Sequence, residues 1–273
     1  MASGAAGVRP AYLPLRTGRS ATNRSLERGL EVLRAFRPGL SALGNAELVE
    51  RTGLPPATVS RLAQTLVDAG WLHRDPKRRL YRLAAPALSL ALAMRQSSRI
   101  LEVAAPRMHE VARRLRINVG VAVADRDEMV YLESIRHGGR PALRTVVTGQ
   151  RVPMELTALG QAWLAVAPAR QRQALIALFR GRRTAAAWPA IAAAIARSKA
   201  EIDAGRCCAA AWQPEVVSVA LPLIVPGEVV HVLNMSVSGT QAVDRVRSEL
   251  GGPLQALRQA IVEQAAALAS ASA

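Results

Sequence analysis

The sequence predicts an α+β protein with two domains, an N-terminal winged helix-turn-helix and a larger C-terminal domain built on an antiparallel sheet. Between residues 45 and 83, two helical segments around a tight turn are followed by a short hairpin with a basic tip. After Asn118, pairs of strand-like segments alternate with helical ones, which is typical of α+β domains. The chain's 273 residues are enough for two separate cores.

The first elements are expected to be an arm and one packing helix. Residues 1–22 are rich in Gly, Ala, Arg and Pro and lack a continuous apolar segment with a cleavage site, so a flexible arm is expected rather than a signal peptide. Ser25 is then predicted to cap a helix that continues through Phe36 and is stopped by Pro38 and Gly39. This helix would belong to a domain of residues 23–85.

The next segment predicts the helix-turn-helix. Asn45 is a plausible N-cap, and Gly53 stands where a left-handed residue would end the first helix. Pro55 and Pro56 fit a turn and the first position of a second helix, where a missing N–H costs nothing. The second helix, residues 57–69, has one apolar face at helical spacing. Its opposite face carries polar side chains, which are Thr58, Ser60, Arg61, Gln64 and Thr65.

Polar groups of this kind near a helix N-terminus reach base edges and phosphates when the helix lies in a DNA major groove. The same pattern also fits the solvated face of any small helical domain. The following segment favours the DNA interpretation. Residues 71–73 and 80–83 form two strand-like runs around a turn with Asp75-Pro76, and the tip carries Lys77, Arg78 and Arg79. Such a wing suits a phosphate backbone, although a solvated charged loop is the alternative.

The charge distribution agrees with a polyanionic partner. The chain has 36 Lys and Arg against 20 Asp and Glu, a net charge of +16. Residues 1–96 hold 15 basic and 6 acidic residues, a net charge of +9, so the charge density is highest there. The bias toward Arg also fits a GC-rich coding sequence, so charge alone does not decide the function.

Several function classes are disfavoured. Cys207 and Cys208 are adjacent, which rarely permits a disulfide, and neither the cysteines nor the four histidines have metal-ligand spacing. A thiol catalyst formed by these cysteines and His231 lacks an activating neighbour in the sequence, and no phosphate-binding glycine motif is present. No apolar run approaches the roughly 18 residues that span a bilayer. We therefore expect a cytoplasmic protein that is not an enzyme and needs no metal or cofactor.

A linker helix is predicted for residues 86–104, because the composition is helical from Ala87 through Val103. Pro106 either kinks this helix or starts the next one, which would end at Leu115. The remaining residues, 105–273, would form the second domain. Its predicted strands are 119–123, 129–132, 143–148, 216–223 and 229–238, and its predicted helices are 158–166, 170–179, 188–204 and 244–269.

One strand of this domain points to a ligand pocket. Because side chains alternate across a strand, Asn234, Ser236 and Ser238 share one side, and Ser218 on the neighbouring strand can join them. A row of small hydrogen-bonding groups suits a carboxylate or a hydroxylated small molecule, although a solvent-facing strand is the alternative. Residues 154–160 form a strand-to-helix entry whose first helical turn would offer free N–H groups to an anion, or Thr157 is an ordinary N-cap.

These residues resemble the IclR-type bacterial transcription regulators over nearly the whole chain from about Ser25. Four stretches in order carry the resemblance: SLERGLEVLRAF, then TGLPPATVSRLAQTLVDAGWL with YRL, then TGQRVPMELTALGQAWLA, and finally WQPEVVSVALPL with NMSVSG. The resemblance implies a winged helix-turn-helix, a linker helix and a GAF-like effector domain. It also implies a homodimer or homotetramer that binds double-stranded DNA at palindromic operators and responds to a small organic acid.

Carried over by motif, the DNA contacts would come from Thr58, Ser60, Arg61 and Gln64 on the second helix and from residues 77–79 on the wing. The effector pocket would include Thr157, Ala158, Leu159, Ser218, Ser236 and Ser238, with Trp212 on a loop above it. The chain departs from the family at residues 206–211, where acidic residues are common, and at its more basic wing tip. Two rival hypotheses stay open at this point, a sequence-indifferent architectural DNA-binding protein and a thiol-dependent enzyme.

Overall fold

The computed structural model describes residues 23–137 and 147–271. The chain divides into two compact units, and the boundary along the sequence lies between Arg95 and Gln96. The predicted N-terminal arm and most of the predicted strand at 143–148 lie outside the described residues. No helix in the described part of the chain combines the length and the apolar character needed to cross a membrane.

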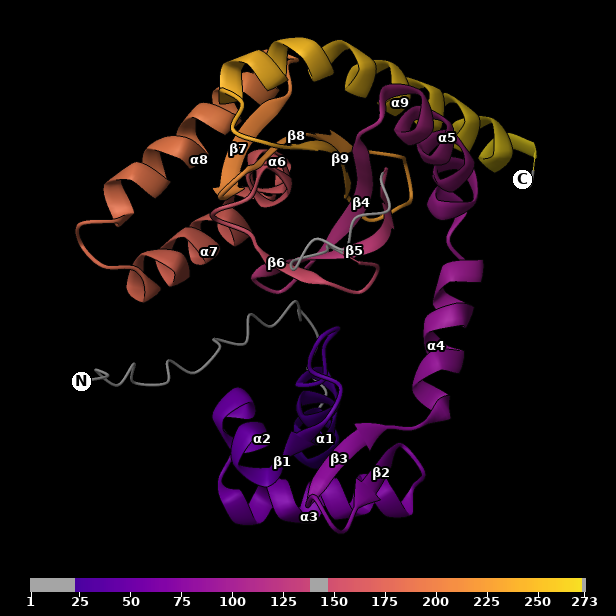
Figure 1. Cartoon of the computed structure of the whole chain (residues 1–273), viewed down its shortest axis with the longest axis vertical. Coiled ribbons are helices and arrows are strands. Elements are labelled where there is room, and N and C mark those ends of the chain that lie inside the picture. Colours follow the sequence, from indigo (N-terminus) through magenta and orange to yellow (C-terminus); the bar gives the residue numbers. More distant parts are fainter. Residues whose placement is uncertain (1–22, 138–146, 272–273) are drawn as a thin grey trace. The chain divides into compact units, whose positions relative to one another are not determined.

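Unit 1 is a winged helix-turn-helix (Figure 1). A three-stranded antiparallel sheet, in the order β1-β3-β2, packs beside three helices. Its core is a cluster of fully buried apolar side chains that includes Val32, Leu43, Leu48, Val59 and Leu72. The elements are α1 (Arg24–Arg34), β1 (Leu43–Gly44), α2 (Asn45–Thr52), α3 (Pro56–Asp68), β2 (Leu72–Asp75), β3 (Leu80–Leu83) and α4 (Ala85–Gln96).

Two predicted N-cap residues were wrong. In both helices the cap lies one or two residues before the predicted one. Asn23, not Ser25, caps α1, because its Oδ1 accepts from the N–H groups of Ser25 and Leu26. Gly44, not Asn45, precedes α2, and the Glu47 carboxylate accepts the Gly44 N–H at 2.7 Å. Because α2 begins one residue earlier than predicted, Asn45 lies inside it. The Asn45 side-chain amide then donates to Ser60 of α3 and does not cap the helix. The predicted stop at Gly53 is confirmed by its left-handed φ of 65°.

The predicted continuous linker helix was also wrong. α4 ends at Gln96, and α5 (Arg99–Leu115) starts anew after Ser98, whose hydroxyl accepts the Leu101 N–H. α5 then continues through Pro106, which neither breaks it nor starts another helix. An interior proline costs about 3 kcal/mol. Burial of a whole apolar face of α5 against α9 and the sheet offsets this cost.

Unit 2 is built on a six-stranded antiparallel sheet in the order β6-β5-β4-β9-β8-β7. The predicted hairpin and the strands near 216 and 231 are confirmed, whereas β6 and β7 were not predicted. Its elements after α5 are β4 (Asn118–Asp125), β5 (Glu128–Ile135), β6 (Arg151–Pro153), α6 (Ala158–Val166), α7 (Ala169–Arg182), α8 (Trp188–Asp203), β7 (Cys208–Gln213), β8 (Val216–Leu223), β9 (His231–Ser238) and α9 (Val243–Ala271).

The two faces of this sheet differ in chemistry. α5 and α9 cover one face, where Val217, Val219, Leu233 and Met235 are buried in a continuous apolar core. α6 lies against the opposite face (Figure 1), to which the alternate residues of β8 and β9 point. Polar side chains of the sheet therefore gather beneath a single helix.

Candidate functional site

The polar face of α3 is on the surface of unit 1, as the sequence predicts. Val59 and Ala63 are completely buried, whereas Ser60, Arg61, Gln64 and Thr65 are exposed and Thr58 is half-buried. Pro55 and Pro56 supply the turn and the first helical residue, so no side chain caps this helix. The N-terminal end of α3 is thus left open to a partner.

Three of the predicted contact side chains already have partners. The Asn45 amide donates to the Ser60 hydroxyl at 3.0 Å and so joins α2 to α3. Gln64 donates to Asp68 at 2.8 Å, and the Thr65 hydroxyl donates to the Arg61 carbonyl. The Arg61 guanidinium, in contrast, has no hydrogen bond or ion pair within the described residues. Arg61 is therefore the side chain most available to a ligand on this face.

The wing is organised by one aspartate. Oδ1 of Asp75 accepts from the backbone N–H groups of both Lys77 and Arg78, at 3.0 Å each, and Arg79 takes a left-handed φ of 55°. The three basic side chains at the tip are exposed. Because the Asp75 carboxylate holds the turn through backbone N–H groups, the three cationic side chains are left to contact an anionic surface.

A small cavity of about 60 Å³ in unit 2 collects most of the predicted effector residues. It lies between α6 and the polar face of the sheet. Predicted residues that line it are Thr157, Ala158, Leu159, Trp212, Ser218, Asn234 and Ser236. Lining residues that the sequence did not suggest are Tyr131, Val152, Ala210, Gln213 and Val216.

Two predicted positions differ from expectation. Ser238 is exposed at the last position of β9 and does not line the cavity, although Val216, its partner on β8, does. Trp212 does line it, but it lies in strand β7 and not on a loop. The pairing of β7 with β8 changes register between Ala210 and Gln213, which places Trp212 in an irregular part of the edge strand.

The start of α6 is held tightly beside the cavity. The Thr157 hydroxyl accepts from the Gly160 N–H at 3.2 Å and donates to the Pro153 carbonyl at 2.8 Å. A Cβ on Gly160 would stand 2.1 Å from the Met154 carbonyl oxygen, so only glycine allows this close contact. The N–H groups of Ala158 and Leu159 have no protein acceptor in the described structure. Both residues line the cavity and can offer these donors to an anion.

The sheet side of the cavity is neutral and polar. The Asn234 amide donates to the Ser218 hydroxyl at 3.1 Å, across the register that pairs Ser218 with Ser236. The Oδ1 atom of Asn234 is buried and accepts no hydrogen bond from the described residues. Burial raises the pKa of the neighbouring Tyr131, an effect that the Asn234 amide partly offsets, so Tyr131 stays protonated.

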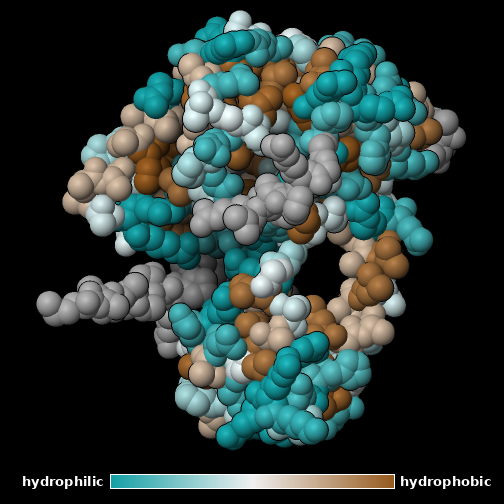
Figure 2. Space-filling view, viewed as in Figure 1, coloured by the Kyte–Doolittle hydropathy of each residue, from teal (hydrophilic) through white to brown (hydrophobic). Residues whose placement is uncertain are grey.

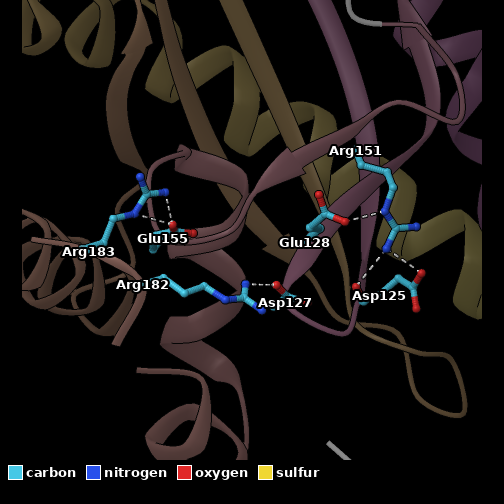
Figure 3. Close-up of polar contacts among 7 residues, drawn as sticks. All are labelled: Asp125, Asp127, Glu128, Arg151, Glu155, Arg182 and Arg183. Atoms are coloured by element: carbon cyan, nitrogen blue, oxygen red, sulfur yellow. Dashed lines mark hydrogen bonds and ion pairs between the residues drawn. The ribbon is translucent and has the colours of Figure 1, made fainter. Parts of the chain in front are cut away.

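Ion pairs fix the loops around this cavity (Figure 3). Arg151 of β6 donates to Glu128 and to Asp125, both at 2.7 Å, and these contacts raise the pKa of Arg151 against the opposing effect of its burial. Arg183 pairs with the buried carboxylate of Glu155, two residues before Thr157. The loop that leads into α6 is therefore anchored from α7.

Both cysteines are buried and free. Burial raises the pKa of Cys207, and burial together with the charge on Cys207 raises that of Cys208 to about 12. A thiol in this environment is not a thiolate near neutral pH, which argues against the thiol-enzyme hypothesis.

Comparison with known families identifies the two units. Residues 25–76 match the IclR helix-turn-helix domain, and residues 92–263 match the C-terminal domain of the bacterial transcriptional regulator IclR. The chain belongs to the IclR family. The expectations of a winged helix-turn-helix and of a C-terminal α/β domain are both confirmed.

Individual IclR-family proteins are similar to this one. The TsaQ1/TsaQ2 regulator of Comamonas testosteroni is 38% identical over 156 residues, which cover 56% of this chain and 55% of that protein. The Pca regulon regulatory protein of Pseudomonas putida is 29% identical over 141 residues, 52% of this chain and 48% of that protein. The match thus spans about half the length of these relatives.

Solved structures extend the likeness to both units. An IclR family transcriptional regulator from Brucella abortus has a TM-score of 0.79 and 32% identity over 92% of this chain and 97% of its own. An IclR homologue from Microbacterium hydrocarbonoxydans, solved in complex with 4-hydroxybenzoate, has a TM-score of 0.63 and 22% identity over 89% of this chain and 99% of its own. The second likeness shows a shared fold alone.

Proposed function

We propose that this IclR-family protein is a cytoplasmic, sequence-specific DNA-binding regulator whose operator affinity is modulated by a small organic acid in the cavity beneath α6. The observation that carries the proposal is the exposed α3 face next to a basic wing in one unit, combined with a polar cavity at a helix N-terminus in the other. An architectural DNA-binding protein would use the charge but has no use for such a cavity.

The DNA contacts divide into two kinds. Arg61 extends from the exposed face of α3 without a partner among the described residues, so it can donate to a guanine edge. Lys77, Arg78 and Arg79 are exposed at the tip of the wing and not on α3, a position that suits phosphate contacts. Ser60 is held by Asn45, and so its main role would be to fix α2 against α3.

The Arg61 assignment is testable with two DNA duplexes, one selected from genomic fragments on the purified protein and one of scrambled sequence. Arg61→Ala should weaken binding to the selected site by roughly 1–3 kcal/mol and change scrambled-site binding little. Arg170→Ala, which removes the same charge from an exposed position of α7, is the matched control and should affect neither. Equal losses on both duplexes for Arg61→Ala would overturn the assignment.

The acid would be held by neutral donors. Among the described residues, no Lys, Arg or His lines the cavity, so a carboxylate would depend on the free N–H groups of Ala158 and Leu159 and on the serine hydroxyls. The complex of an IclR homologue with 4-hydroxybenzoate supports an organic acid as the ligand class. Trp212 and Tyr131 supply apolar surface to the rest of such a molecule.

The two serines of β9 allow a matched test of the pocket. Ser236 lines the cavity, whereas Ser238 is exposed outside it on the same strand. Ser236→Ala should reduce the response of operator binding to an active acid, and Ser238→Ala should leave that response unchanged. The two variants should bind the operator equally without ligand. An unchanged response in Ser236→Ala would exclude this cavity as the effector site.

The protein would act as a homo-oligomer on a palindromic operator. α4 has no buried residue, although it is apolar on all sides. Figure 2 shows hydrophobic residues along this helix, and Leu88, Leu90, Leu92 and Met94 are 47–64% exposed. A helix of this kind normally lies inside a protein interface. We infer that α4 of a second copy covers it, which would place two α3 helices in one complex and favour a DNA site with two-fold symmetry.

A further inference from the structure

A second cavity of unit 2 lies among the helices α6, α7 and α8. Its volume is about 240 Å³, and it shares no lining residue with the cavity beneath α6. Figure 1 shows α7 and α8 extending to one side of α6. α8 packs closely against α6, whereas α7 approaches neither helix as closely, so a space remains among the three helices.

The walls of this second cavity are mainly apolar. Leu164 of α6 is fully buried and Ile195 of α8 nearly so, and the half-buried side chains of Ile176 and Trp188 also line the space. Ala192 of α8 is too short to fill it. At about 30 Å³ for each water-sized group, the cavity accepts a molecule of about eight to ten non-hydrogen atoms. Because ordered water needs polar partners, such walls suit a hydrocarbon or aromatic group better than water.

Two cationic side chains line the same cavity, Arg172 of α7 and Lys199 of α8. The Arg172 guanidinium donates to the Ala167 carbonyl at 3.0 Å and makes no other hydrogen bond or ion pair with the described residues. Lys199 pairs with Asp203 one turn along α8, in an exposed contact of a kind that stabilises little. No Asp or Glu of the described chain lines the cavity, so it combines apolar walls with positive charge.

We propose that this second cavity is a further ligand site, which binds an apolar carboxylic acid of about eight to ten non-hydrogen atoms. The hydrocarbon or aromatic part of the acid lies among Leu164, Ile176 and Trp188, and its carboxylate accepts from Arg172 and Lys199. A guanidinium matches a carboxylate in shape and charge, and enclosure of the apolar part removes it from water. The proposal is independent of the effector function proposed above, because the two cavities have no lining residue in common.

Each cavity has its own tryptophan, so fluorescence can identify which one a ligand enters. Trp188 lines the second cavity, and Trp212 lines the cavity beneath α6. The full-length protein is titrated with phenylacetate and heptanoate and with the neutral 2-phenylethanol and 1-heptanol, by calorimetry and by tryptophan fluorescence. At least one acid should bind about tenfold or more tightly than its alcohol, as a charge-assisted hydrogen bond provides. The fluorescence change should disappear in Trp188→Phe and persist in Trp212→Phe.

Two further variants test the charge and the space separately. Arg172→Gln should reduce the affinity for the acid to that for the alcohol, whereas Arg170→Gln, exposed on α7 outside the cavity, should leave it unchanged. Ala192→Phe fills the cavity and should abolish binding of acid and alcohol alike. Ala193→Phe, exposed on α8 and not part of the lining, is its control. If Ala192→Phe does not fold, Arg172→Gln and Trp188→Phe still decide the question.

Three results would overturn the inference. The first is that none of the four compounds binds, including the case in which Ala192→Phe alters the oligomer and so shows the cavity to be a contact between copies. The second is equal affinity for acid and alcohol, which would mean that Arg172 and Lys199 do not hold a carboxylate. The third is a fluorescence change that depends on Trp212 and not on Trp188, which would place the acid beneath α6 and leave the proposed effector function standing.

Discussion

At the scale of single residues, Gly120 leaves room for the side chains of Tyr131 and Asn234, which both line the cavity beneath α6. A methyl group there would overlap Tyr131 and Asn234, at 2.5 and 2.6 Å. Because both neighbours are buried, they cannot move aside without disturbing the sheet, and Gly120→Ala should destabilise the protein by about 1–3 kcal/mol. Urea unfolding measures this change.

Gly252→Ala is the matched control for that substitution. It lies within α9, and an added Cβ meets nothing within 4 Å. Because alanine favours a helix over glycine, this variant should gain up to about 1 kcal/mol. A loss in Gly252→Ala similar to that in Gly120→Ala would show that local packing is not the cause.

His231 gives the protein a predictable pH dependence. The ring is buried, and its Nδ1 lies 2.8 Å from the Val229 carbonyl. Burial lowers its pKa, an effect that the Val229 carbonyl and Glu228 partly offset. The unfolded chain therefore binds a proton before the folded protein does, and this contribution to stability, fully present above a pH of about 6.5, is lost as the pH falls below it.

The measurement is the free energy of unfolding in urea between about pH 7.5 and pH 5. Each unit by which burial lowers the pKa corresponds to about 1.4 kcal/mol lost toward low pH. His231→Asn should show a flatter profile, whereas His109→Asn, exposed on α5, should follow the unaltered protein. Parallel profiles for His231→Asn and the unaltered protein would contradict the assignment.

Alternation along β9 was enough to place Asn234 and Ser236 on one face from the sequence. It did not reveal Tyr131, because β5 is joined to β9 only through β4, and strand order is not encoded in any local pattern. The Asn45–Ser60 contact escaped prediction for a similar reason. It links residues 15 positions apart, and the one-residue extension of α2 decides which group Asn45 faces.

At the scale of elements, the wing should act through charge alone. Replacing Lys77, Arg78 and Arg79 by alanine should weaken binding to selected and scrambled duplexes alike, because phosphate contacts carry no sequence information. The slope of log affinity against log salt should decrease by about one for each phosphate that the variant no longer neutralises. A salt titration by fluorescence anisotropy on both duplexes measures it.

A specific loss on the selected duplex alone would show instead that the wing reads bases. Asp75→Ala offers a second variant, since it keeps all three cations and removes the carboxylate that accepts from the Lys77 and Arg78 N–H groups and so holds the turn. Its effect should be smaller than that of the triple substitution, and the salt slope should stay close to that of the unaltered protein.

Helices with clear stop signals were predictable, whereas helices shaped by tertiary packing were not. Gly53 ended α2 as expected, because a left-handed residue is a local requirement. The prediction of a kink or a new helix at Pro106 failed, because the apolar face that α5 buries against α9 outweighs the local cost of the proline. The edge strand β7 was missed since its sequence, CAAAWQ, has little strand preference, and pairing with β8 alone makes it a strand.

At the scale of the whole molecule, the proposed DNA-binding and ligand-binding functions belong to different units. The residues of α3 and the wing that we propose to contact DNA lie in unit 1, and the cavity beneath α6 lies entirely in unit 2. Regulation by a ligand therefore requires that occupation of the cavity change how the assembled protein presents its α3 helices. In the proposed oligomer, such a change would alter the spacing of the α3 helices, so the proposed α4 contact is the feature to test.

The proposed α4 interface predicts a concentration-dependent dimer. Leu88 and Leu92 lie one turn apart and are 64% and 48% exposed. Replacing both by glutamine should weaken association by roughly 1.5 kcal/mol per leucine removed from the interface, and operator affinity should fall with it. Ile224→Gln with Val229→Gln, at 54% and 67% exposure in unit 2, removes as much exposed apolar surface and should change neither property. Sedimentation equilibrium and operator titration on the same samples measure both, and an unaltered oligomer in the α4 variant would mean that another surface joins the copies.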